Sequence, residues 1–470
     1  MPDRSGQATP VPRQHHDLLL TNGRVVTSDG VRTAAVAVDN GTVTALLDDV
    51  DGVTADSFLD VRGRYVLPGL IDSHVHFRTP GLTYKEDWAH GSRAAAAGGV
   101  TTVFDMPNTR PALTDPAEVA GRAAAIAGSS LVDFRFHLGT SSQGLATIDD
   151  LRPRDAVSVK IFMAGHHTAP NVLGGQKELE YAFAAAAERG VRLVLHAEDQ
   201  AVFALLDAAN PAPTTYVGLE PARPRSGGIV AVARVIELVR RFNTKAHILH
   251  VSSLEEVALL VAARRTGLPV TFEVTGHHLS FTAADTERLG ARIRLSPAIR
   301  SAADREALWH ALHAGDVDTL GSDHAPHTIE EKLRPLPDAP PGIPGVQELA
   351  TAVFTGMRRR EPETPVDQHL MILARHLAQR PAELFGISAR KGTIATGMDA
   401  DFAVFDAHHP WMFGERDVQS KAGWSAYEGW TMAGRIVTTI RRARVIWDGE
   451  NGPGFGDPDG VWLDAAMPDC

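Results

Sequence analysis

The chain has 470 residues and a formal net charge of −11. This length suits a large domain with an accessory one, and this charge argues against nucleic acid or an anionic membrane as the main partner. The only cysteine, Cys470, excludes an intrachain disulfide and fits a reducing cytoplasm. Because no stretch resembles a signal peptide or reaches the roughly 18 apolar residues of a membrane span, we expect a cytoplasmic protein that acts on a small molecule.

Short β-type runs occur near both ends of the chain. The first are residues 18–27 and 34–46, which contain the hairpin signals Asn22-Gly23 and Asn40-Gly41. Similar runs return at residues 392–406 and 434–450. We therefore expect one small β-sandwich domain built from residues 17–66 and 389–450, with tails at 1–16 and 451–470.

Between these ends, short β-branched runs alternate with alanine-rich helical stretches. The predicted strands are residues 65–76, 100–106, 132–139, 157–164, 191–196, 246–252, 270–275 and 317–322. The clearest helices are residues 87–99, 177–190, 227–242, 254–267 and 301–315. Eight strands alternating with helices predict an α/β fold, a (β/α)8 barrel of the TIM type over residues 67–388, with its chemistry at the carboxyl ends of the strands.

Histidines occupy several of these strand ends. His74 and His76, in the stretch "DSHVHF", point to the same side of an extended segment. They form either a metal site or a buried pair satisfied by polar neighbours. His196 ends the fifth strand, His250 the sixth, and Asp323 the eighth. This repetition at matching positions favours the metal site.

A lysine ends the fourth strand. Lys160 is flanked by Val159 and Ile161, where an ammonium ion is costly to bury and tends to lose its proton. A neutral amine can react with carbon dioxide to give a carbamate, a two-oxygen ligand able to bridge two metals. The alternative is an inward-pointing lysine paired with Asp323.

These motifs, with "YKEDWAHGSRAAAAGG" and "VTGHHLSFT", resemble the cyclic amidohydrolases of the dihydroorotase, allantoinase and dihydropyrimidinase group over residues 17–450. The resemblance implies a hydrolase with two divalent metal ions. Its ligands would be His74, His76 and Asp323 for one ion, His196 and His250 for the other, and carbamylated Lys160 as the bridge. The imidazole-rich ligation favours zinc over other divalent ions. Asp323 would be the general base and then the general acid. The resemblance also implies a homodimer or homotetramer.

The choice of ring depends on residues around this centre. Arg78 lies on the same face as His76 if the segment stays extended, and a guanidinium binds a carboxylate well. By resemblance, Arg78, Asn108 and His327 match the set with which dihydroorotases bind the substrate carboxylate, and Ser296 would face the ring. The alternatives are a surface ion pair for Arg78 and a turn role for Asn108. Dihydropyrimidinases place a tyrosine where this chain has Gly165.

Some positions depart from the dihydroorotase pattern. Thr79 replaces an acidic residue, Ser296 replaces an asparagine, and Gln347 replaces a glutamate. The pair His166–His167 is an addition near Lys160, and the proline-rich loop 334–345 is either a rim of the site or a plain connection. Dihydroorotase is the leading prediction. Allantoinase or another cyclic-ureide hydrolase is the alternative, and a catalytically silent scaffold is a second class.

Overall fold

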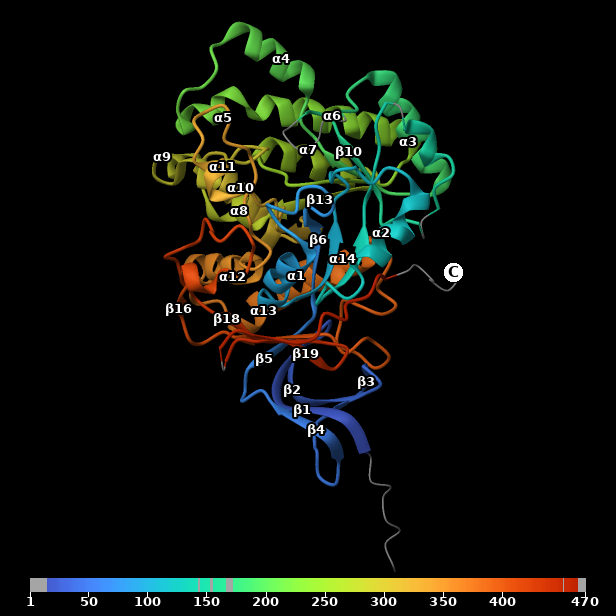
Figure 1. Cartoon of the computed structure of the whole chain (residues 1–470), viewed down its shortest axis with the longest axis vertical. Helices are drawn as coiled ribbons and strands as arrows, with labels where there is room; N and C mark the ends of the chain where they lie inside the picture. Colours follow the sequence, from blue (N-terminus) through green and yellow to red (C-terminus); the bar gives the residue numbers. More distant parts are fainter. Residues whose placement is uncertain (1–14, 143, 153–154, 166–171, 451, 464–470) are drawn as a thin grey trace, which may run out of the picture.

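A computed structural model describes residues 15–142, 144–152, 155–165, 172–450 and 452–463. Figure 1 shows a barrel wrapped by helices, with a sheet of strands from both chain ends beneath it. This arrangement confirms the predicted (β/α)8 barrel with a small β domain built from both ends. None of the described helices is long and apolar enough to cross a membrane.

The barrel strands follow the predicted runs closely. They are β6 (Leu70–Val75), β7 (Val100–Asp105), β8 (Asp133–Phe136), β9 (Leu138–Gly139), β10 (Val159–Phe162), β11 (Leu193–His196), β12 (Ala246–Ile248), β13 (Val270–Thr275) and β14 (Thr319–Gly321). Parallel pairing joins β6 to β8 in one sheet and β9 to β14 in another, and only His137 separates β8 from β9. The ring closes where the His76 amide donates to the His324 carbonyl oxygen at 2.9 Å.

Helices cover the outside of the barrel. They are α1 (Trp88–Ala97), α2 (Val119–Ile126), α3 (Gln176–Arg189), α4 (Gln200–Ala209), α5 (Leu219–Ala222), α6 (Arg225–Phe242), α7 (Leu254–Arg265), α8 (Gly276–Ser280), α9 (Thr286–Leu289), α10 (Ala302–His313), α11 (Ile329–Lys332), α12 (Leu349–Arg360), α13 (Val366–Ala374) and α14 (Arg380–Leu384). Local chemistry sets several starts: Asp87 caps α1, and Ser253 with Glu256 forms a capping box on α7. The alanine-rich face of α1 is buried against the strands, which explains its small side chains.

The β domain is one nine-stranded sheet. Its strands are β1 (His15–Thr27), β2 (Gly30–Asp39), β3 (Thr42–Leu47), β4 (Thr54–Asp60), β5 (Tyr65–Pro68), β15 (Phe402–Asp406), β18 (Arg435–Arg441), β19 (Arg444–Asp448) and β20 (Gly454–Phe455). The antiparallel pairing of β5 with β15 joins the two ends of the chain, and buried residues such as Val25, Val36 and Phe402 form its separate core. A short hairpin, β16 (Trp411–Met412) with β17 (Thr431–Met432), lies outside it.

The predicted tails need correction where the structure describes them. Strand β1 already begins at His15, and residues 1–14 lie outside the described residues. At the other end, β20 pairs with β19, Trp462 bridges Phe134 of the barrel, and Leu463 is only 4% exposed. We predicted a tail here, but the pairing of β20 and two large apolar side chains, Trp462 and Leu463, hold this segment against the β domain and the barrel.

Candidate metal centre and substrate pocket

One pocket at the carboxyl ends of the barrel strands gathers the predicted residues. Its wall includes all six proposed metal ligands together with Arg78 and Ser296; the lining residues are His74, His76, Arg78, Lys160, Phe162, His196, His250, Ser296, Asp323, Ala325, Pro341 and Gly342. His74 and His76 therefore face a polar pocket and not a dry apolar core. Convergence of imidazole, amine and carboxylate groups from separate strands is typical of a catalytic or metal site.

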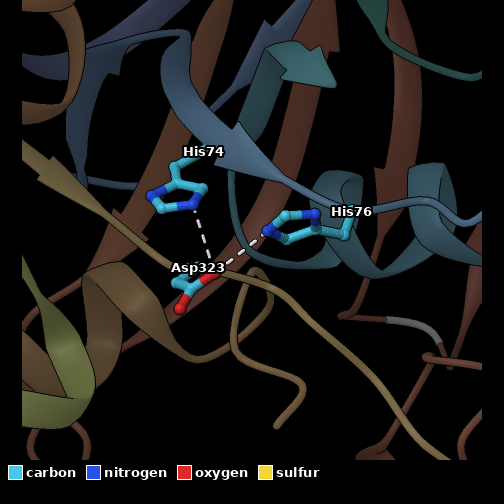
Figure 2. A group of neighbouring side chains, drawn as sticks. All are labelled: His74, His76 and Asp323. Carbon is cyan, nitrogen blue, oxygen red and sulfur yellow. Dashed lines mark hydrogen bonds and ion pairs between the residues drawn. The ribbon is translucent and has the colours of Figure 1, made fainter. Parts of the chain in front are cut away.

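Three of these groups already point at a common centre. Figure 2 shows His74 on β6 and His76 just past the end of that strand, with Asp323 opposite them. The Nε2 atoms of both histidines lie 3.2 Å from the same carboxylate oxygen, Oδ1 of Asp323. One ligand atom from each residue falls within 4.8 Å of the others, so this group could hold a metal ion. Burial lowers the pKa of His74 to about 3, which keeps the ring neutral and able to donate a lone pair.

The other ring nitrogens of this pair are held by partners from neighbouring strands. His74 Nδ1 lies 2.7 Å from Glu273 Oε1, and His76 Nδ1 lies 2.7 Å from Asn108 Oδ1. Burial raises the pKa of Glu273 to about 8, but its Oε1 also receives the backbone N–H of His250 and so acts as an acceptor in either protonation state. His74 consequently donates from Nδ1 and presents its Nε2 lone pair to the pocket.

A second pair of histidines lies beside the first group. His196 Nδ1 and His250 Nε2 are 3.0 Å apart, and the opposite nitrogen of His196 contacts Glu198 at 2.8 Å. Arg223 donates to the same Glu198 oxygen at 2.6 Å. Burial opposes the charge on Glu198, but these two partners bring its pKa well below the ordinary value. An ionised Glu198 therefore fixes which nitrogen of His196 faces His250.

Lys160 sits between these groups as a buried amine. It is 1% exposed, and its Nζ lies 4.5 Å from the centre of the Phe162 ring. Burial lowers the pKa of Lys160 to about 7, although the carboxylates of Asp323 and Glu273 oppose that shift. Within the described part of the chain no carboxylate forms an ion pair with it, so the alternative pairing with Asp323 is not formed. A substantial fraction of the amine is neutral near pH 7.

Arg78 brings a positive charge to the same pocket. It is 1% exposed and has a left-handed backbone (φ 61°), so the chain departs from the extended form expected after His76. Among the described residues neither its Nε nor its Nη1 has a hydrogen-bond partner. Burial lowers the pKa of Arg78 to about 10. A buried guanidinium with free donors is costly, and Arg78 is not the surface ion pair that its sequence context also allowed.

Two other predicted substrate residues are buried next to the pocket and not in its wall. The Asn108 side chain contacts His76, as described above. His327 Nδ1 lies 2.9 Å from Lys85 Nζ and 3.2 Å from Glu331 Oε2. His327 lies directly behind Gly342, where an added Cβ would approach its ring at 3.2 Å. The backbone of Gly342 has φ +120°, and that Cβ would also come within 2.6 Å of the Ala325 carbonyl oxygen, so a side chain does not fit there.

Comparison with known proteins decides the family. The model of the amidohydrolase family matches residues 65–450. The chain belongs to the amidohydrolase family. This amidohydrolase is 34% identical over 442 residues to a dihydroorotase from Methanosarcina acetivorans, a match that covers 92% of each chain. It is 33% identical over 452 residues to an allantoinase from Streptomyces avermitilis, a match that covers 95% of this chain and 98% of that one.

Solved structures agree with this assignment. The L-hydantoinase (dihydropyrimidinase) from Arthrobacter aurescens superposes with a TM-score of 0.88 at 28% identity, over 95% of this chain and 99% of that chain. The predicted family relationship is confirmed, and this amidohydrolase is a hydrolase that acts on cyclic amides. Its relatives are named for three different substrates, so the identity of the substrate ring has to be argued from the residues of the pocket.

Of the three positions that depart from the dihydroorotase pattern, one lines the pocket and two make contacts elsewhere. Ser296 lines the pocket, but Thr79 bonds the Phe77 carbonyl oxygen, and Gln347 bonds the backbone at residues 417 and 419. The proline-rich loop is a rim, because Pro341 and Gly342 belong to the pocket wall. His166 and His167 lie outside the described residues. Sequence reasoning missed Glu273, Glu198 and Lys85; Glu273 at least carried a signal, a charged residue inside an apolar strand.

Proposed function

We propose that this amidohydrolase interconverts dihydroorotate and N-carbamoyl-L-aspartate, the ring-opening and ring-closing step of pyrimidine biosynthesis. The observation that carries the proposal is Arg78, a buried guanidinium in the pocket wall whose Nε and Nη1 atoms have no hydrogen-bond partner in the described residues. A substrate carboxylate would satisfy both charge and donors. Dihydroorotate carries such a group, and allantoin, hydantoin and dihydrouracil do not.

The same pocket fits a pair of divalent metal ions. His74, His76 and Asp323 would hold one, His196 and His250 the other, and Lys160 as a carbamate would bridge them. The donor set supports this fit, because neutral imidazoles and a carboxylate converge on one centre, and the outer nitrogens of His74, His76 and His196 are already bonded. Imidazole-rich ligation favours zinc. When bound, the ions would supply a water of lowered pKa and a Lewis acid for the ring carbonyl.

The chain's own residues supply the remaining chemistry. A neutral Lys160 amine forms an N–C bond to carbon dioxide and releases one proton, which leaves an anionic carbamate. Asp323, on the pocket wall with a side chain 14% exposed, would accept a proton from the attacking water and deliver it to the leaving ring nitrogen. In the reverse direction, the same carboxylate would take the proton from the carbamoyl nitrogen as the ring closes.

Binding of the substrate carboxylate would centre on Arg78. Asn108 and His327, both buried beside it, would complete the set if substrate draws their side chains forward. His327 Nδ1 faces both the Lys85 ammonium and the Glu331 carboxylate, and acceptance from Lys85 would leave its Nε2–H as a donor, which suits an anion. Ser296 would face the ring with one hydroxyl where a longer amide is usual. Assembly as a homodimer or homotetramer belongs to the same proposal.

Allantoinase is the second candidate, because Ser296 lines the pocket and a relative of that name matches nearly the full chain. The test compares kcat/KM of the purified, zinc-supplemented protein for dihydroorotate, allantoin, hydantoin and dihydrouracil. We expect dihydroorotate to be the best substrate. A higher kcat/KM for a neutral ring would refute the proposal, and Ser296→Asn would then identify the residue responsible if it reversed that preference.

A further inference from the structure

Glu273 occupies a position that touches both halves of the proposed ligand set. It lies inside β13, is 0% exposed, and points its carboxylate between β6 and β12. Its Oε1 accepts the Nδ1–H of His74 at 2.7 Å and the backbone N–H of His250 at 3.1 Å. The main-chain oxygen of Glu273 also accepts the next amide, that of Val251, at 2.9 Å. One residue thus holds the ring of one ligand and the backbone beneath another.

Strand β14 leaves room for the Glu273 carboxylate. Gly321 is the last residue of β14, two positions before Asp323. A Cβ added at Gly321 would lie 2.3 Å from Glu273 Oε2 and 2.5 Å from its carboxyl carbon. The Glu273 carboxyl therefore fills the space that a side chain at position 321 would need. It bonds His74 and the His250 backbone and packs against β14, the strand that leads to Asp323.

Two other buried acids near the site, Asp72 and Asp105, do not make comparable contacts. Asp72 Oδ1 accepts the backbone amides of His74 and Ser322, and Asp105 accepts the backbone amide of Phe77. Both shape the main chain and touch no ligand ring. Glu273 alone, among these three acids, combines contact with a ligand ring and support of the left-handed backbone at His250 (φ 39°).

We propose that Glu273 is a positioning residue that couples the two halves of the metal centre: it fixes the His74 tautomer with its Nε2 lone pair toward the pocket, and it holds the His250 backbone so that both ions bind together. The inference rests on the ligand set of the proposed function but not on which ring is the substrate. Outer partners of metal ligands of this kind are worth about 10–100-fold in metal affinity.

The test is titration of the chelator-stripped full chain with Zn²⁺ against a competing dye, with far-UV circular dichroism as the check on folding. Glu273→Ala removes both contacts and should weaken zinc binding about 10–100-fold. Glu273→Gln keeps the acceptor oxygen and should recover most of that loss. Gly321→Ala should weaken zinc binding with Glu273 untouched, because its methyl group displaces the carboxylate. Gly356→Ala on α12 is the matched control: its Cβ would lie 2.4 Å from the Trp309 ring of α10, so it brings a similar clash without touching a ligand.

The decisive variant is the double substitution of Glu273→Ala with Gly321→Ala. If Gly321 acts through Glu273, the double variant should bind zinc no more weakly than Glu273→Ala alone, a non-additive result. Additive losses, or a folded Glu273→Ala with wild-type zinc affinity at both sites, would overturn the inference. Should Glu273→Ala fail to fold, wild-type zinc affinity in a folded Gly321→Ala would overturn it equally. Failure of the wild-type chain to bind zinc would instead remove the ligand set itself, and the inference with it.

Discussion

Two arginines with the same exposure should respond in opposite ways to the same substitution. Arg78 and Arg441 are each 1% exposed. Arg78 lines the pocket, and its Nε and Nη1 have no hydrogen-bond partner within the described part of the chain, whereas Arg441 donates to Asp133 Oδ1 at 2.7 Å and also bonds Asp459. We predict that Arg78→Met reduces activity and spares stability, and that Arg441→Met reduces stability and spares the chemistry.

The magnitudes follow from these contacts. A hydrogen bond to a charged group contributes about 1.5–3 kcal/mol, so loss of Arg78 should lower kcat/KM for dihydroorotate about tenfold to a hundredfold. Methionine also removes a buried guanidinium whose pKa burial has already lowered to about 10, so the free energy of unfolding should stay the same or rise. Arg441→Met breaks a buried ion pair, which typically costs about 3–5 kcal/mol.

Steady-state kinetics with dihydroorotate and with a neutral ring, together with urea unfolding of both variants, measure these effects. The activity loss of Arg78→Met should be confined to the carboxylated ring. The reasoning fails if Arg78→Met retains wild-type kcat/KM for dihydroorotate, or if it unfolds as readily as Arg441→Met.

Three further predictions concern the ligand set and the ion network below the barrel. Asp323→Asn should lower turnover by at least about 10²–10⁴-fold while the chain stays folded, and near-normal turnover would remove Asp323 from the mechanism. Lys160→Ala should reduce the zinc content found by elemental analysis, and full occupancy by two ions would exclude the bridging role. The Lys391 side chain is 2% exposed and contacts Asp133 at 2.7 Å and Asp401 at 2.6 Å. Burial alone would lower the pKa of Lys391, but these carboxylates raise it. The stabilisation by Lys391 is therefore complete below the unfolded-state pKa of about 10.4 and is lost only as pH rises through the higher folded-state pKa. Urea unfolding should show Lys391→Met destabilised by about 3–5 kcal/mol at pH 7. The difference in unfolding free energy from the wild type should shrink only in strong alkali.

The sequence allowed the barrel to be predicted because its strands and helices differ in period and composition. Apolar β-branched runs and alanine-rich helices alternate clearly between Tyr65 and Ser322. Residues 452–463 were missed, since glycine, proline and aspartate dominate that stretch and its contacts are made with distant parts of the chain: β20 pairs with β19, and Leu463 is buried against the barrel. Composition alone cannot detect such long-range contacts.

The site was predictable to the extent that strand ends define it. His74, His196 and Asp323 could be placed from the alternation of elements, because the carboxyl ends of barrel strands meet at one face. The directions of side chains beyond those ends were not predictable. Asn108 contacts His76, and Arg78 has a left-handed backbone where an extended one was expected. Glu273 could have been found by the logic that singled out Lys160, since both are charged residues inside apolar strands.

The most direct test of the metal centre is anomalous diffraction at the zinc absorption edge from crystals of the zinc-loaded protein. The account predicts two anomalous peaks per chain, one beside His74, His76 and Asp323 and one beside His196 and His250. It also predicts carbamate density on Lys160 Nζ between them. A single peak, or an unmodified Lys160 paired directly with Asp323, would contradict it.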